Sequence, residues 1–281
     1  MKATISSTVL ITGCASGIGL ALSREFKRQG FQVFATDLLV ESIVNLEKEG
    51  IITGGCDVRS AASIKACVSK ALTIMGRIDV LVNNAGIGVI GPSAELTADD
   101  IRRQFEINFF GPCALTVEVL PSMMDRRSGV IVNMGSVSGV LPTPFAGAYC
   151  ASKAALHAWS DSLRVELRPF NVRVITVQPG AVKTNWGIVA SKELGRFYRK
   201  SSRYAPLAEV IEQRAKTHLE NSTSAEDVAS AIVNTVHAGG NGVLRTGNES
   251  RKLPFLKWLL PQGLIDRILY RRFSLDKLEG R

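Results

Sequence analysis

Tyr149 and Lys153 are the residues of this chain whose types and spacing most directly suggest chemistry. They lie four positions apart in the sequence YCASK, and on a helix this spacing places both side chains on one face. A lysine ammonium beside a tyrosine stabilises the phenolate, and so lowers a pKa that is ordinarily about 10. The pair is therefore a candidate for proton transfer, unless the tyrosine only packs on the lysine stem.

A glycine-rich loop, TGCASGIG at residues 12–19, lies between an apolar run and a helical pattern. Gly13 permits a tight turn, Gly17 lets the backbone approach a pyrophosphate, and Gly19 permits close packing of helix on strand. The helix start offers free N–H groups to phosphate oxygens. The alternative is a tight turn without a ligand. The loop residues expected to bind a dinucleotide are Gly13, Ser16, Gly17, Ile18 and Gly19.

An acidic residue, Asp37, ends the second apolar run about 20 residues after the loop, where a carboxylate binds the hydroxyls of the adenosine ribose. Such a carboxylate repels a 2′-phosphate, and neither Ser16 nor Leu38 supplies a positive charge beside it. NAD(H) is therefore favoured, with NADP(H) possible if another basic residue such as Arg59 reaches the phosphate. Asp37 could instead cap the helical run that follows. The residues expected beside the adenine ring are Asp57 and Val58, unless Asp57 is an ordinary turn residue.

Short apolar runs alternate with amphipathic stretches, and these elements must position the residues above. The expected strands are 8–12, 32–36, 51–56, 78–83, 129–134, 172–177 and 242–246, and the expected helices are 17–29, 60–75, 98–125, 149–168 and 225–238. Near-continuous apolar strands separated by helices indicate a parallel sheet covered on both faces. We predict an α/β fold of Rossmann type, a doubly wound, seven-stranded parallel sheet with helices on both faces. The predicted domain spans 1–250, with a substrate loop at 185–224, and a basic amphipathic tail at 251–281.

Composition narrows the class of protein further. Hydrophobic residues make up 46% of the 281 residues and charged residues 21%, which is a globular balance. The net charge is +9, of which the segment after Ser250 carries +5. No basic patch interleaved with aromatic residues lies in the first half, so no nucleic acid partner is expected. Five cysteines without a CxxC pair argue against a disulfide framework or a zinc site. We expect a cytoplasmic protein without a signal peptide or membrane span.

Taken together, the motifs resemble the short-chain dehydrogenase/reductase family over roughly residues 8–248. The resemblance is carried by TGCASGIG (12–19), NNAG (83–86), Asn108 in FEINFFG, Ser136 in NMGSVSG, YCASK (149–153) and PG (179–180). Their joint occurrence in this order is specific. The TGC start, the apolar loop and the basic tail are also similar to the lipid- and steroid-type reductases of the family.

This resemblance implies roles for four residues in catalysis. Tyr149 would be the acid/base, and Lys153 would tune its pKa and hold the nicotinamide ribose. Ser136 would donate a hydrogen bond to the substrate oxygen, where charge develops. Asn108 would hold a water that relays protons to solvent, or else is a polar residue that bends a helix.

The resemblance also implies a cofactor site beyond the glycine loop. Asn83 would tie neighbouring strands together, and the small residues of NNAG would leave room for the adenosine half. The Pro-Gly pair would frame the nicotinamide pocket, although a strand-end turn explains it equally well. The residues assigned to the cofactor here are Asn84, Ala85, Gly86, Tyr149, Lys153, Pro179, Gly180, Val182 and Thr184.

The resulting hypothesis is an NAD(P)(H)-dependent oxidoreductase that interconverts a secondary alcohol and a ketone on a lipophilic, steroid-, retinoid- or acyl-lipid-like substrate. Two alternatives use the same site: a non-catalytic dinucleotide sensor, and an epimerase or dehydratase. A sensor need not keep a proton relay, and the stretch after residue 184 is short for a sugar-nucleotide domain. The residues that suggest an apolar pocket, or else plain core, are Val137, Val140, Leu141, Pro142, Phe145 and Trp186.

Two surfaces suggest partners. The resemblance implies that helices 98–125 and 149–168 pair with their copies in a homodimer or homotetramer, unless their apolar residues face only the sheet. These residues are Phe109, Phe110, Leu115, Leu156, Trp159 and Leu163. In the tail, one helical face would carry Leu264, Ile265, Ile268, Leu269 and Phe273, with Phe255, Trp258 and Leu259 upstream. This face would either pack on the protein or make peripheral contact with an anionic membrane.

Overall fold

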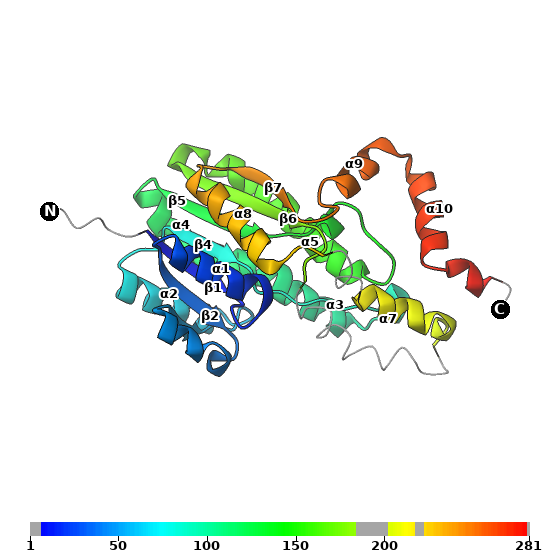
Figure 1. The fold of residues 1–281 in the computed structure, drawn as a ribbon, viewed down its shortest axis with the longest axis horizontal. Helices are drawn as coiled ribbons and strands as arrows, with labels where there is room; N and C mark the ends of the chain where they lie inside the picture. The colour runs from blue at the N-terminus through cyan, green and yellow to red at the C-terminus, as the bar shows by residue number, and fades with distance from the viewer. Residues whose placement is uncertain (1–6, 184–201, 217–221, 280–281) are drawn as a thin grey trace.

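Seven parallel strands form the sheet of the computed structural model, which describes residues 7–183, 202–216 and 222–279 (Figure 1). The strands are β1 (Thr8–Thr12), β2 (Gln32–Asp37), β3 (Ile52–Gly55), β4 (Val80–Asn83), β5 (Gly129–Met134), β6 (Val172–Pro179) and β7 (Gly242–Thr246). Their order is β3-β2-β1-β4-β5-β6-β7, and every pair is parallel. The predicted doubly wound α/β fold is confirmed.

Helices cover both faces of this sheet. One face packs on α1 (Gly17–Arg28) and α8 (Ala225–His237), and the other on α2 (Ala61–Met75), α4 (Gly111–Asp125) and α5 (Gly147–Glu166). Successive strand residues point to opposite faces, so Val9 and Ile11 join the first core and Leu10 the second. Burial on both faces explains why the strands read as almost continuous apolar runs.

The expected helix 98–125 is interrupted. It consists of α3 (Ala98–Phe105), a π-helical turn (Glu106–Phe110) and α4, and the turn places Asn108 fully inside the protein. Within Ala98–Asp125, an 18-residue window has a mean hydropathy of 1.2, so by length and composition alone this stretch could cross a membrane, contrary to expectation. Among the described residues the stretch packs against α2 and α5, and 44% of that window is buried inside the protein.

The helices proposed for self-association expose a part of the expected surface. Leu115, Leu156 and Leu163 are buried inside the protein, Leu115 and Leu163 in the core cluster on this face of the sheet, so these three do not reach the surface. Phe110 is exposed as expected, and Val117 and Val165 are exposed beside the expected residues. Self-association through α4 and α5 stays a prediction, resting on these residues.

The tail forms α9 (Lys252–Leu259) and α10 (Gln262–Arg272), an arm beyond the carboxyl end of the sheet (Figure 1). Phe273 and Ile265 are buried, and Phe273 joins a third cluster with Phe145 and with Leu207 and Ile211 at α7 (Ala208–Lys216). Leu264 and Ile268, by contrast, are more than 40% exposed. The single apolar face expected from the sequence is thus divided between a packed side and an exposed side.

Candidate functional site

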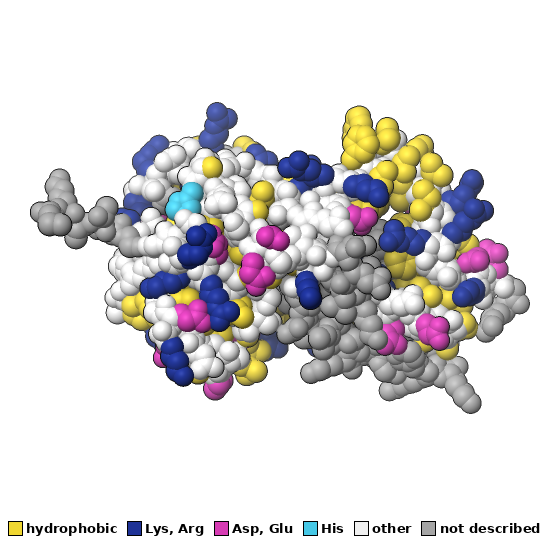
Figure 2. Space-filling view, viewed as in Figure 1, with side chains coloured by type: hydrophobic (Ala, Val, Ile, Leu, Met, Phe, Trp, Pro, Cys, Tyr) yellow, Lys and Arg dark blue, Asp and Glu magenta, His cyan; other side chains and the backbone are white. Residues whose placement is uncertain are grey.

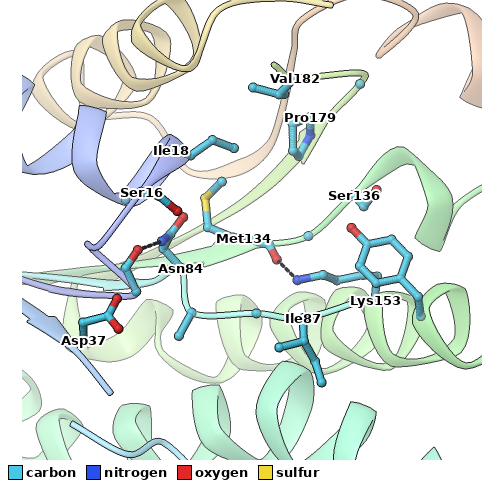
Figure 3. Close-up of a pocket in the computed structure, with 18 residues that line it drawn as sticks. Ser16, Ile18, Asp37, Asn84, Ile87, Met134, Ser136, Lys153, Pro179 and Val182 are labelled. Carbon is cyan, nitrogen blue, oxygen red and sulfur yellow. Dashed lines mark hydrogen bonds between the residues drawn. The ribbon is translucent and has the colours of Figure 1, made fainter. Parts of the chain in front are cut away.

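A cavity of about 260 Å³ opens at the carboxyl ends of the parallel strands, beside the switch from β1 to β4 (Figure 3). The sequence-predicted residues that line it are Gly13, Ser16, Gly17, Ile18, Gly19, Asp37, Asn84, Ala85, Gly86, Ser136, Tyr149, Lys153, Pro179, Gly180 and Val182. Ile87, Met134 and Gly135 also line it and were not predicted. Thr184 and Trp186 lie outside the described residues.

The loop between β1 and α1 has room only for glycine at two positions. A Cβ on Gly13, whose φ is +72°, would lie 2.8 Å from the Cα of Ala85. A Cβ on Gly19 would lie 2.0 Å from the carbonyl oxygen of Gly13. The start of α1 therefore lies directly on the ends of β1 and β4, with its N-terminal N–H groups toward the cavity. Residues with this arrangement fit the pyrophosphate of a dinucleotide.

Asn83, the last residue of β4, was expected to tie neighbouring strands together, and Asn84 after it shares this role. The Nδ2 group of Asn83 donates to the side chains of Thr116 (2.9 Å) and Asn133 (2.8 Å), linking β4 to α4 and β5. It is Asn84 that binds backbone: its Nδ2 donates to the carbonyls of Thr12 (2.9 Å) and Gly13 (3.0 Å). Asn84 thus fixes the glycine loop as well as lining the cavity.

Of the two acidic residues expected beside the adenosine, Asp37 lines the cavity and Asp57 does not. Asp37 ends β2 at the cavity wall, where its Oδ2 accepts a hydrogen bond from the Ala15 N–H at 2.9 Å. Asp57 is instead paired with Arg59 at 2.8 Å, and this guanidinium lowers the pKa of the Asp57 carboxyl. Val58 packs against the backbone at Gly111. Neither Asp57 nor Val58 lines the cavity, so the expectation that they face the adenine has no support in the structure.

On α5, Tyr149 and Lys153 point to the same cavity, as their spacing predicts. The Nζ of Lys153 donates to the carbonyl of Met134 at 2.6 Å and lies 5.9 Å from the centre of the Tyr149 ring (Figure 3). Lys153 is only 5% exposed, and burial lowers its pKa to about 8. An ammonium in this position needs the carbonyl as a partner, because a buried charge without one is costly.

The pKa of Tyr149 is raised, whereas the sequence led us to expect a lowered value. Burial raises it, while a hydrogen bond with Ser136 and the charge of Arg214 act in the opposite direction more weakly. The ammonium of Lys153 donates to the Met134 carbonyl and is itself desolvated. The hydroxyl of Tyr149 is therefore protonated at neutral pH.

The buried Asn108 side chain binds the loop after β4. Its Oδ1 accepts from the Ile87 N–H at 2.9 Å, and its Nδ2 donates to the Ile87 carbonyl at 3.0 Å. A Cβ on Gly86 would lie 3.4 Å from this Oδ1 and 3.7 Å from the Nζ of Lys153, so Asn108 and Lys153 flank the same glycine. Asn108 therefore holds the cavity wall next to Lys153, and its role in a proton relay stays a prediction.

Sequence reasoning missed His157. Its Nε2 accepts a hydrogen bond from the Ser136 N–H at 3.3 Å, directly behind the Ser136 hydroxyl. A Cβ on Gly135 would lie 2.2 Å from this nitrogen, so the glycine makes room for the ring. Burial and the charge of Lys153 lower the pKa of His157 to about 4, which keeps the ring a neutral acceptor. The available signal was spacing, since Tyr149, Lys153 and His157 follow one another at four-residue intervals.

Comparison with known proteins agrees with this site. The family model described as short chain dehydrogenase matches residues 7–194. A short-chain dehydrogenase, srdE of Neurospora crassa, is 37% identical over 275 residues, 96% of this chain and 93% of that protein. A solved short-chain dehydrogenase from Streptomyces avermitilis is 27% identical with a TM-score of 0.79, over 99% of this chain and 98% of that one. The closed form of a serine dehydrogenase complexed with NADP+ is 27% identical with a TM-score of 0.75, over 87% and 96%.

These matches span the glycine loop, Ser136 and the Tyr149–Lys153 pair, which the structure brings to one cavity. The family expected from the motifs is therefore confirmed: the chain belongs to the short-chain dehydrogenases.

Proposed function

We propose that this oxidoreductase interconverts an alcohol and a carbonyl compound, with Tyr149 as the proton donor and acceptor. The observation that carries the proposal is the convergence of Ser136, Tyr149 and Lys153 on the cavity formed by the glycine loop. A nicotinamide dinucleotide, as in the NADP+-bound relative, would supply or accept the hydride when bound. The Ser136 hydroxyl would donate to the substrate oxygen, and Tyr149 would protonate that oxygen in the reducing direction. No observation specifically favours the two alternative functions, a dinucleotide sensor and an epimerase or dehydratase.

Replacing the tyrosine hydroxyl tests this assignment. Tyr149→Phe should lower kcat for carbonyl reduction by a factor of about 10²–10⁴, because the proton donor is lost. The affinity for NADH, measured by fluorescence titration, should stay within a factor of about two, since the ring remains. Tyr270→Phe, which removes a tail hydroxyl whose described hydrogen bond is to Glu279, is the matched control. Unchanged kcat in Tyr149→Phe would contradict the assignment.

The lowered pKa of Lys153 predicts a pH dependence. The ammonium form predominates below the pKa of about 8 and is lost as the pH rises through it. The kcat/KM for reduction, which reports ionisations in the free enzyme, should therefore fall above about pH 8. Lys153→Met should be slow at every pH and lack this inflection. An identical inflection in Lys153→Met would show that another group titrates.

For the cofactor we propose a preference for NAD(H). The carboxylate of Asp37 is fixed at the cavity wall by Ala15, and Arg59 is occupied by Asp57. The kcat/KM with NADH should exceed that with NADPH about tenfold or more, and Asp37→Asn should narrow the ratio by reducing repulsion of the 2′-phosphate. Asp99→Asn, which neutralises an exposed carboxylate paired with Arg102, keeps both the Asp37 carboxylate and the Asp57–Arg59 pair and should keep the preference. Higher kcat/KM of the wild type with NADPH would refute the proposal.

A lipophilic substrate is supported by the exposed side of the tail. Trp258 is 80% exposed, Phe255 and Leu259 are 54% exposed, and these apolar side chains lie among lysines and arginines (Figure 2). Aromatic residues flanked by basic ones suit the interface of an anionic membrane, where each basic residue contributes roughly 1 kcal/mol. We propose peripheral contact through α9, from which a lipophilic substrate would reach the cavity.

Flotation with liposomes tests the membrane contact. The intact protein should float with phosphatidylserine-containing vesicles at low salt, and the Phe255→Ser/Trp258→Ser double variant should not. Point variants are preferable to truncation because Phe273 anchors the tail to the protein core. Phe110→Ser, which changes an exposed residue outside the tail, is the control. Equal flotation of all three proteins, or of none, would contradict the proposal.

A further inference from the structure

A second cavity, of about 130 Å³, lies on the other side of Ser136 from the glycine loop. Its wall is formed partly by the segment that follows β5 and partly by the tail. Its apolar lining consists of Val137, Leu141, Leu253, Leu269 and Phe273. Since Ser136 lines both cavities, this one is where the body of a substrate would lie while its reacting oxygen meets Ser136 and Tyr149.

Within this apolar cavity lies a buried guanidinium. Arg214, on α7, is 8% exposed and lines the cavity. Its Nε and one terminal nitrogen donate to the Thr143 hydroxyl at 3.2 and 3.1 Å, which holds the group in place. No carboxylate of the described residues forms an ion pair with Arg214. Glu249 also lines the cavity, and its described ion pair is with Lys252 at 3.8 Å.

Among the described residues the Arg214 guanidinium is held by a hydroxyl, and such a buried charge is costly because a neutral acceptor replaces little of its hydration. Burial of Arg214 is the main cause that lowers its pKa, and the charge of Arg272, which lines the same cavity, acts more weakly in the same direction. Two guanidiniums of like sign, neither paired with a carboxylate in the described part of the chain, make the cavity electropositive. A carboxylate is the ligand that the planar guanidinium geometry matches best.

We propose that this cavity binds a carbonyl substrate with an apolar body and a carboxylate, which pairs with Arg214 and is reinforced by Arg272. The inference rests on the proposed function, and narrows its substrate class from lipophilic carbonyl compounds to amphiphilic oxo acids. The carboxylate supplies the missing countercharge, and the apolar lining holds the chain between it and the reacting carbonyl.

Matched substrates test the proposal. A series of oxo acids of increasing chain length is compared with the corresponding methyl esters in NADH- and NADPH-dependent reduction. The wild type should favour the acid over its ester at the best length. Arg214→Gln should lower kcat/KM for the acid on the order of a hundredfold and leave the ester within a few fold. Arg272→Gln should have the same selectivity with a smaller effect, and Arg271→Gln, an exposed neighbour, should change neither substrate.

Two results would overturn the carboxylate site. One is a wild type that reduces ester and acid equally well, and the other is an equal loss of both in Arg214→Gln, which would mean that Arg214 acts on Tyr149 or on folding. Calorimetric titration of the oxo acids into the protein separates this proposal from the proposed function. Binding that depends on Arg214 without turnover of any carbonyl compound would refute the reaction and support the carboxylate site.

Discussion

The close approach of the glycine loop to the end of β4 is the constraint on which the site depends. Gly13 and Gly19 bring the start of α1 against the strands, and Asn84 fastens that loop through two backbone carbonyls. Parallel strands end at one edge of the sheet, so this contact decides how wide the cavity is there. A single Cβ at either glycine would push α1 away and disturb the cofactor side and the packing of α1 together.

Helix α5 carries the reactive groups, and its burial determines their charge states. Lys153 and His157 of this helix contact the ends of β5 and β6. Lys153 keeps a carbonyl partner at Met134, and His157 stays a neutral acceptor behind Ser136. Tyr149 stays protonated because desolvation outweighs the stabilisation of its phenolate. The proposed proton transfer thus depends on the packing of one helix face as much as on the residue types on it.

The tail and α7, which lie outside the sheet, form the second cavity and the exposed apolar surface of this chain. Phe273 anchors the tail to the cluster around Phe145, and α7 brings Arg214 beside the cavity. The same tail supplies the apolar wall of that cavity on one side and exposed aromatic residues on the other. The proposed substrate cavity and the exposed aromatic surface therefore share one short segment, whereas the first cavity is lined by the glycine loop, the strand ends and α5.

The sequence by itself determined the seven strands, the glycine loop and the Tyr149–Lys153 pair, because buried parallel strands and helix faces have short, local periodicities. It did not determine the roles of Asp57, Leu115 or Leu163. An acidic residue in a turn, or a leucine in a helix, gives the same sequence pattern whichever part of the protein it contacts. His157 and Arg214 were overlooked for a related reason. Their significance lies in what surrounds them, Ser136 for one and an apolar wall with Thr143 for the other. Only the tertiary structure decides such surroundings, because burial and long-range contacts set the charge and hydrogen bonding of a side chain, and local sequence does not encode them.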